Sequence, residues 1–210
     1  MALDEERARA SVDSRELESL LRGGDGAVAL RKQLLARLVA DPDLGGQDGR
    51  IDDAFLSRHE RYVLSLKRAK LVRTRGYADH PAYHSMRLNR EGGALEKAGA
   101  LGLHVGMFLP TIELLGTKEQ REEWLPRARS LEIIGTYAQT ELGHGTNLAK
   151  LETTAEYDAS TGEFVIHTPS VSATKWWPGG LGKHATHCVL MAKLILAGVD
   201  MGLRSFILPL

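Results

Sequence analysis

The stretch from Gly135 to Lys150 reads GTYAQTELGHGTNLAK, and the interpretation of the whole chain starts from it. It is rich in hydroxyl and amide side chains, which can contact a ligand without reacting with it: Thr136, Gln139, Thr140, Thr146 and Asn147. Gly143 and Gly145 lack a Cβ, so a flat or phosphorylated ligand can lie against the backbone there. The pattern predicts a ligand-binding segment.

A second candidate segment, Lys175 to Lys183, reads KWWPGGLGK. Its two indoles, Trp176 and Trp177, have two interpretations: core residues, or an aromatic wall beside a turn that Pro178 fixes. A planar heteroaromatic cofactor needs such an apolar wall together with a few directed N–H donors, which glycine backbone can supply. Both interpretations stay open at this point.

Composition limits the classes of function. The chain has 210 residues, of which 43% are hydrophobic and 26% charged, as in ordinary globular proteins. Lys and Arg together number 27, as do Asp and Glu, and this zero net charge argues against a nucleic-acid partner. The single cysteine and the polar N-terminus predict a soluble intracellular protein without disulfides or a secretory signal. No stretch is apolar enough to span a membrane.

The first two thirds of the chain have helical periodicity. A cap at Asp13 begins one helix, and apolar residues at helical spacing predict others over 27–40 and 53–75. Thr117 with Gln120 predicts a capped helix that follows. We therefore expect a helical N-terminal domain over residues 1–134.

The segment from Leu95 to Leu115 is apolar on most sides, which predicts a buried helix. It nevertheless contains Gly99, Gly102 and Gly106 on one face. Each glycine costs a helix about 1 kcal/mol relative to alanine. The glycines indicate either close helix packing or a surface against which an acyl chain or a cofactor ring lies.

From Ile133 onward the period changes to two. The pattern predicts a hairpin over 153–158 and 163–167, and a second strand pair over 186–196 and 203–210. The fold class is thus α+β, with an antiparallel β domain over residues 135–210. Because that domain stops within an apolar strand, we expect it to be incomplete and Leu210 not to be a natural carboxyl terminus.

Few residues are candidates for chemistry. Glu141 has a bland interpretation, in which it pairs with a basic residue or accepts backbone N–H groups, and this is favoured over a reactive role. His184, His187 and Cys188 are close in sequence but too few for a convincing zinc site, so no metal is predicted. Nucleophile elbows, Walker loops and Rossmann fingerprints are missing from the sequence.

Two motifs together resemble a known family. TYAQTELGHGTNLAKLETTAEYD (136–158) and KWWPGGLGK (175–183) look like the peroxisomal acyl-CoA oxidases, within the acyl-CoA dehydrogenase superfamily. The superfamily pattern Ala/Leu-x-Thr-Glu-x-Gly-x-Gly-Ser/Thr is matched by residues 138–146, and the Gly-His-Gly-Thr and Trp-Trp-Pro-Gly-Gly versions are more typical of the oxidases. The resemblance is dense from Leu101 to Leu210 and collinear before that.

The resemblance implies an enzyme that uses FAD to convert a fatty acyl-CoA and molecular oxygen to trans-2-enoyl-CoA and hydrogen peroxide. It also implies a helical, β, helical domain order, a homodimer when the protein is full length, and a peroxisomal location. The C-terminal helical domains and their catalytic glutamate have no counterpart in this chain. No catalytic residue is therefore assigned, and this chain alone is expected to be inactive.

Residue by residue, the resemblance assigns cofactor contacts to two positions. Thr140 matches the threonine that hydrogen-bonds the flavin, and Gly179 matches the glycine whose backbone contacts it. Trp176, Trp177 and Gly180 are expected to line the same wall. Two other functions stay open: an acyl-CoA dehydrogenase that uses a protein electron acceptor, and a truncated, non-catalytic binding isoform.

Overall fold

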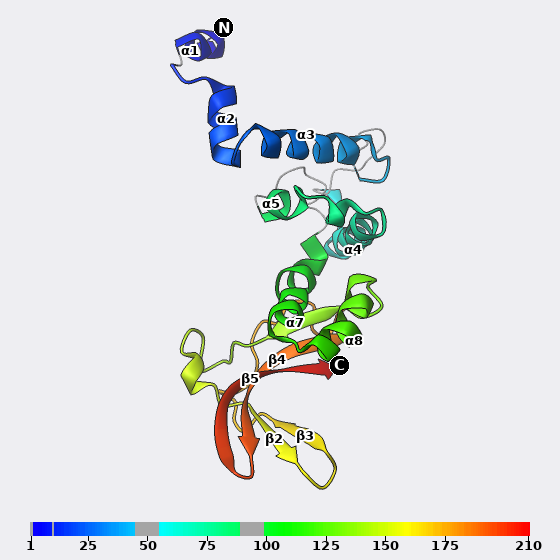
Figure 1. Cartoon of the computed structure of the whole chain (residues 1–210), viewed down its shortest axis with the longest axis vertical. Coiled ribbons are helices and arrows are strands. Elements are labelled where there is room, and N and C mark those ends of the chain that lie inside the picture. Colours follow the sequence, from blue (N-terminus) through cyan, green and yellow to red (C-terminus); the bar gives the residue numbers. More distant parts are fainter. Residues whose placement is uncertain (1, 10, 45–54, 89–98) are drawn as a thin grey trace. The chain divides into compact units, whose positions relative to one another are not determined.

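The computed structural model describes residues 2–9, 11–44, 55–88 and 99–210 (Figure 1). The chain divides into two compact units, Met1–Ala100 and Leu101–Leu210. The change from helix to strand comes later, at Gly135, where the first strand begins. A domain boundary at residue 134 stays a prediction. No helix within the described residues is long and apolar enough to cross a bilayer.

The first unit is helical in its described parts. Its elements are α1 (Ala2–Arg9), α2 (Ser14–Arg22), α3 (Asp25–Ala40), α4 (Arg58–Thr74), the 3-10 turn η2 (Tyr77–Asp79) and α5 (Tyr83–Leu88). The predicted cap of α2 is confirmed, because the Asp13 carboxylate accepts the N–H groups of Arg15 and Glu16. The helix ends at Gly23 in the left-handed conformation that glycine allows.

Helix α4 begins later than the predicted start at Asp53, a residue that lies outside the described part of the chain. The described start follows from a capping box that the sequence interpretation missed. Ser57 accepts the Glu60 N–H, and the Glu60 carboxylate accepts the Ser57 N–H. These reciprocal bonds satisfy donors that a helix leaves free at its first turn, so Arg58 is the first helical residue.

The core of this unit includes a buried carboxylate, Asp41. Burial alone would raise its pKa, but hydrogen bonds from Arg75, the Tyr77 hydroxyl and the Asp43 N–H outweigh burial and lower the pKa from 3.8 to about 2. The apolar core of the same unit comprises Leu34, Leu38, Leu44, Val72, Tyr77, Ala82 and Met86. The carboxylate therefore fastens the end of α3 to the residues that follow α4.

Asp41→Asn is expected to lower the free energy of unfolding by about 2 kcal/mol at neutral pH, as the lowering of the Asp41 pKa from 3.8 to about 2 implies. Because the pKa is lower in the folded state, the stabilisation is present above pH 3.8 and is lost as the pH falls through about 2. Denaturant titrations of both proteins at several pH values test this. Asp43→Asn is the matched control, since its half-exposed carboxylate binds the same Arg75 and should matter less. Equal stability of Asp41→Asn and the wild type at pH 7 would contradict the prediction.

A helical run begins at Gly99, two residues before the second unit, and a separate helix follows it. The run comprises η3 (Gly99–Leu101), the π-helical η4 (His104–Phe108) and α7 (Leu109–Leu115); α8 (Lys118–Arg129) follows after the predicted Thr117 cap. Pro110 has no N–H to donate to the carbonyl four residues earlier, and its ring would clash with that carbonyl in a regular α-helix. The wider π-helical turn lies directly before it. Residues 95–98 of the predicted helix lie outside the described residues.

The prediction of a buried helix is confirmed for most of its described residues and fails at its C-terminal end. Phe108 and Ile112 are buried, but the side chains of Leu114 and Leu115 are 81% and 68% exposed. A Cβ on Gly99 or Gly102 would meet no described atom within 4 Å, so close helix packing does not explain these two glycines.

In the described part of the chain, five strands form one sheet. They are β1 (Gly135–Ala138), β2 (Thr154–Asp158), β3 (Glu163–His167), β4 (His187–Leu196) and β5 (Val199–Pro209). The two predicted antiparallel pairs, β2 with β3 and β4 with β5, are confirmed. The second is tighter than predicted, because β5 already begins at Val199. Ala197 and Gly198 alone form the turn, both with positive φ as two-residue hairpins require.

The sheet as a whole is mixed, which corrects the expectation of an antiparallel domain. β4 lies in its middle, with β5 antiparallel on one edge. On the other edge β1 pairs with it in parallel from His187 to Leu190, and β2 pairs with it in parallel from Lys193 to Ile195. Local periodicity identifies hairpins, but parallel pairs require a long connection that periodicity does not reveal.

Alternating residues of β4 face two different layers. Val189 packs with Phe108 of η4 and with Ile112 and other residues of α7 and α8, and these two helices cover one face of the sheet (Figure 1). Cys188 and Leu190 pack on the opposite face with alanines of β1 and β2. This alternation is the normal consequence of a two-residue strand period.

Candidate functional site

The two ligand-like segments predicted from the sequence lie side by side. Glu141 and Lys175 form an isolated antiparallel bridge between them. Next to this bridge, the Trp176 N–H donates to the Thr140 carbonyl at 2.9 Å, and the Leu142 N–H donates to the Thr174 carbonyl at 3.0 Å. The loop that follows β1 and the segment that precedes β4 are therefore one structural feature, which we call the seat: residues 139–145 and 174–180.

A second contact fastens the turn of the seat to β1. The Thr136 hydroxyl is fully buried and donates to the Gly179 carbonyl at 2.7 Å. The sequence places Thr136 among the side chains that can contact a ligand, but its buried hydroxyl is used inside the protein. Gln139 is also engaged, since its side-chain oxygen accepts the Tyr137 hydroxyl at 2.9 Å.

The two predicted cofactor contacts belong to the seat and keep unused donors. Thr140 is half-buried, and its hydroxyl makes no hydrogen bond to any described residue. Gly179 is exposed, and within the described chain its N–H has no acceptor, as is also true of the Trp177 N–H. A hydroxyl and two backbone donors are therefore available to a ligand from outside.

The paired tryptophans are at the surface. Trp176 is 57% exposed and Trp177 is 78% exposed, so the interpretation that they are core residues is wrong. Trp177 also has φ +50°, a left-handed conformation that is uncommon and strained for a bulky residue. Leu142, and Leu181 directly after the seat, add apolar surface that is 47% and 43% exposed. The seat thus presents an aromatic and aliphatic wall to its surroundings.

Beneath this wall lies an ion pair. The Glu141 side chain is fully buried and the Lys175 side chain is 10% exposed, with 3.0 Å between carboxylate and ammonium. Glu141 also accepts the N–H groups of Glu152 and Thr153, at 2.7 and 2.9 Å, and the Thr153 hydroxyl at 2.6 Å. The bland interpretation of Glu141 is confirmed: it pairs with a basic residue and accepts backbone N–H groups.

Protonation of the pair follows from these contacts. Burial alone would raise the pKa of Glu141, but the Thr153 hydroxyl, the two backbone N–H groups and Lys175 outweigh burial and lower the pKa below 4.5. Burial lowers the pKa of the Lys175 ammonium, while Glu141 opposes that effect. A carboxylate with a lowered pKa and four donors is poorly suited to abstract a proton.

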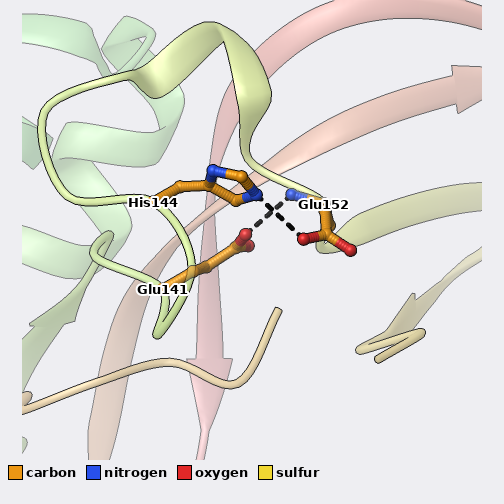
Figure 2. Close-up of side chains that lie close together, drawn as sticks. All are labelled: Glu141, His144 and Glu152. Atoms are coloured by element: carbon orange, nitrogen blue, oxygen red, sulfur yellow. Dashed lines mark hydrogen bonds and ion pairs between the residues drawn. The ribbon is translucent and has the colours of Figure 1, made fainter. Parts of the chain in front are cut away.

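A second carboxylate, Glu152, organises the outer side of the loop. Figure 2 shows the His144 ring directed at the Glu152 side chain, with 2.9 Å between Nε2 and Oε1. The hydroxyls of Ser170 and Ser172 also donate to Glu152, each at 2.8 Å. These hydrogen bonds lower the pKa of Glu152, with the two serines contributing most.

Glu141, His144 and Glu152 each place one possible metal-ligand atom within 4.8 Å of the others. The same atoms are already engaged in hydrogen bonds, since the Glu152 N–H donates to Glu141 and His144 contacts Glu152 (Figure 2). A cation would have to displace those donors. The cluster is therefore best explained as a hydrogen-bonded frame for the loop.

The glycines of the first segment differ in role. A Cβ on Gly143 would lie 2.9 Å from the Ser172 Cβ, so this glycine allows close approach of two chain segments. A Cβ on Gly145 would meet nothing within 4 Å, which leaves the surface there open.

The geometry of β4 separates two of the residues considered for a zinc site. His187 contacts the Trp124 ring on one face of β4, while Cys188 packs on the other.

Comparison with known proteins assigns the chain to a family. Residues 13–134, more than half of the chain, match a family model described as acyl-coenzyme A oxidase N-terminal. The chain belongs to the acyl-CoA oxidase family. It is 45% identical over 216 residues to acyl-coenzyme A oxidase 1 of Drosophila melanogaster, covering 99% of this chain and 32% of that relative. It is 41% identical over 213 residues to peroxisomal acyl-coenzyme A oxidase 1 of Arabidopsis thaliana, covering 99% and 30%.

The fold agrees with this family assignment. The crystal structure of acyl-CoA oxidase-2 of Caenorhabditis elegans, bound with FAD, ascaroside-CoA and ATP, matches with a TM-score of 0.79 and 34% identity. That match covers 99% of this chain and 31% of the nematode chain. The α+β fold class, with helices followed by an acyl-CoA oxidase type of sheet, is confirmed. The acyl-CoA oxidase relatives are about three times as long as this chain.

Sequence reasoning missed two residues that shape the seat. In the sequence Lys175 is the first residue of the KWWPGGLGK motif, and no role is predicted for Glu152. Neither has a local signal, because Lys175 and Glu141 are 34 residues apart and Glu152 gathers serines 18 and 20 residues away. The available signal in the sequence is the position of the charged Lys175 directly before the two tryptophans.

Proposed function

We propose that this chain supplies the N-terminal part of an FAD-dependent acyl-CoA oxidase of fatty acid β-oxidation. The reaction converts a fatty acyl-CoA and oxygen to trans-2-enoyl-CoA and hydrogen peroxide. Thr140 and Gly179 are the proposed flavin contacts, with Trp176, Trp177 and Gly180 lining the same wall. No catalytic residue is proposed within these 210 residues.

The observation that carries the proposal is the seat itself. Two segments joined by hydrogen bonds present exposed indoles together with unused donors: the Thr140 hydroxyl and the N–H groups of Trp177 and Gly179. A planar ring with carbonyl and ring-nitrogen acceptors needs this combination of apolar surface and directed donors. The residues present therefore fit a flavin.

When bound, FAD supplies the redox chemistry, taking a hydride equivalent from the substrate and passing electrons to oxygen. The chain's own contribution is orientation and exclusion of water. The Thr140 hydroxyl and the Gly179 N–H would fix the ring by hydrogen bonds, and the indoles would cover part of it. Glu141 would act as a structural carboxylate, since its oxygens already accept hydrogen bonds from four donors.

Location and assembly extend the same proposal. We propose that the protein acts in the peroxisome, which the name of the Arabidopsis relative supports. A homodimer is proposed for the full-length protein. Acyl-CoA and oxygen are its proposed small-molecule partners.

Two alternatives make different predictions. A dehydrogenase would reduce a protein acceptor, and its reduced flavin would be reoxidised slowly by air. The relatives named oxidases favour fast reoxidation instead. A non-catalytic isoform would bind full-length subunits without turning over substrate.

The test uses two proteins, the 210-residue chain and a chimera. The chimera carries this chain in place of the matching part of the Drosophila oxidase. Each is mixed with FAD and palmitoyl-CoA, and hydrogen peroxide is measured, with the unmodified Drosophila protein as reference. We expect peroxide from the chimera and none from the chain alone. A folded chimera that binds FAD but makes no peroxide would refute the oxidase proposal.

Thr140→Val tests the cofactor contact in the same chimera. Loss of one hydrogen bond predicts a dissociation constant for FAD about 3- to 10-fold higher. Fluorescence titration of FAD measures this, and the control Thr161→Val changes a threonine in the exposed β2–β3 turn. If both variants bind FAD as tightly as the parent chimera, Thr140 is not a flavin contact.

A further inference from the structure

The edge of β4 has a break between its two parallel neighbours. β1 ends opposite Leu190, and β2 is next paired opposite Lys193. Between them the Met191 carbonyl faces a gap in which no described strand pairs with β4. The Lys175 ammonium donates to this carbonyl at 2.7 Å.

Lys175 joins three parts of the chain at this point. Besides Met191, its ammonium donates to the Gln139 carbonyl just after β1 and to the Glu141 carboxylate, both at 3.0 Å. An ammonium has three donors, and here each one has a partner. No apolar side chain of similar length could satisfy two carbonyls and a carboxylate together.

Glu141 extends the same connection to β2. Its carboxylate accepts the N–H groups of Glu152 and Thr153, immediately before the first residue of β2. The Thr153 hydroxyl adds a third bond from that side. The ion pair therefore holds the end of β1, the start of β2 and the middle of β4 around a single buried point.

The pair is also adjacent in sequence to the proposed ligand contacts. Glu141 follows Thr140 directly, and Lys175 directly precedes Trp176. We propose that the Glu141–Lys175 ion pair is a positioning device that holds Thr140 and the Trp176–Gly179 turn in register, so that the seat exists before its ligand binds. The effect of the ion pair on flavin binding rests on the proposed function. Its effect on the structure of the seat can be tested without any ligand.

The ligand-free test is hydrogen exchange on the 210-residue chain. The milder variant Thr153→Val removes one donor to Glu141 and keeps both charges, while Glu141→Gln removes the pair. We expect the Trp176 and Leu142 amides, which bond across the seat, to exchange at least about tenfold faster relative to β4 amides. Unchanged relative protection at both amides, in a folded Thr153→Val or Glu141→Gln protein, would overturn the proposal.

The flavin test uses the chimera and a control matched for stability. Ile112→Ala makes a cavity between α7 and the sheet and should lower Tm by a similar amount. We expect Glu141→Gln and Lys175→Met each to raise the dissociation constant for FAD at least about tenfold and to alter its visible circular dichroism. Ile112→Ala should bind FAD within about twofold of the parent chimera.

The outcomes separate the two proposals. If the parent chimera binds FAD and both pair variants, when folded, bind it as tightly, the positioning role is wrong. If Ile112→Ala weakens FAD binding as much as the pair variants, the pair acts only through stability and the positioning role is again wrong. If the parent chimera binds no FAD, the proposed function fails, and hydrogen exchange alone decides the positioning role.

Discussion

Glu141→Gln is expected to lower the free energy of unfolding of this chain by about 3–5 kcal/mol. The substitution removes one charge of a buried pair and leaves the Lys175 ammonium without its counter-ion. It also turns an acceptor of four hydrogen bonds into an amide, which cannot accept on its nitrogen side. Chemical denaturation followed by circular dichroism at pH 7 measures the loss.

The pH dependence gives an independent check on the cause. The folded-state pKa of Glu141 lies below 4.5, so its stabilisation is present above that pH and is lost as the pH falls through the folded pKa. The stability difference between wild type and Glu141→Gln should therefore shrink in acid. Glu113→Gln is the control, because Glu113 and Arg129 form an exposed ion pair that should contribute no more than about 1 kcal/mol. A Glu141→Gln protein as stable as Glu113→Gln at pH 7 would contradict this account.

Phe108→Ala is expected to cost about 3–5 kcal/mol for a different reason, the cavity that it leaves. Phe108 is fully buried where the π-helical turn meets β1, and its ring stacks on His104 with 5.6 Å between ring centroids. His104 accepts the Gly135 N–H on Nδ1 at 2.9 Å, so its Nε2 carries the proton and donates to the Ala128 carbonyl. Loss of the ring removes apolar contacts and the support of this histidine.

Substitution of Gly135 tests the same contact from the side of β1. A Cβ at this position would overlap the Phe108 ring, so Gly135→Ala should be destabilising by about 1–3 kcal/mol through overpacking. The double variant should lose less than the two single losses added together, because alanine then has space. Met107→Ala, on a side chain that is 40% exposed, is the control for this helix. Strict additivity of Phe108→Ala and Gly135→Ala would show that the two residues do not meet.

These two expected losses concern the framework on which the seat is built. Phe108 packs α7 and α8 against one face of the sheet, and the Glu141–Lys175 pair closes the break along the edge of β4. Among the described residues, the Thr140 hydroxyl and the Gly179 N–H have no hydrogen-bond partner. That difference is the reason to expect ligand effects from Thr140 and stability effects from Glu141.

Much of this was predictable from the sequence. Helix caps at Asp13 and Thr117 and the β2–β3 hairpin depend on residues within a few positions of one another, so local patterns identify them. The family was identified from two motifs whose residue types and spacing are specific. The glycine and indole content of those motifs also indicated a flat, heteroaromatic ligand.

Tertiary structure decided how those pieces meet. The parallel pairing of β1 and β2 along β4, the inward use of the Thr136 hydroxyl and the exposure of both indoles have no local signal. Glu141 finds Lys175 across 34 residues because the chain returns beside itself before β4. The sequence by itself determined the family and predicted two candidate ligand segments, since motifs are properties of neighbouring residues. Only the fold could decide that a buried ion pair joins them, because burial and long-range pairing arise when the chain closes on itself.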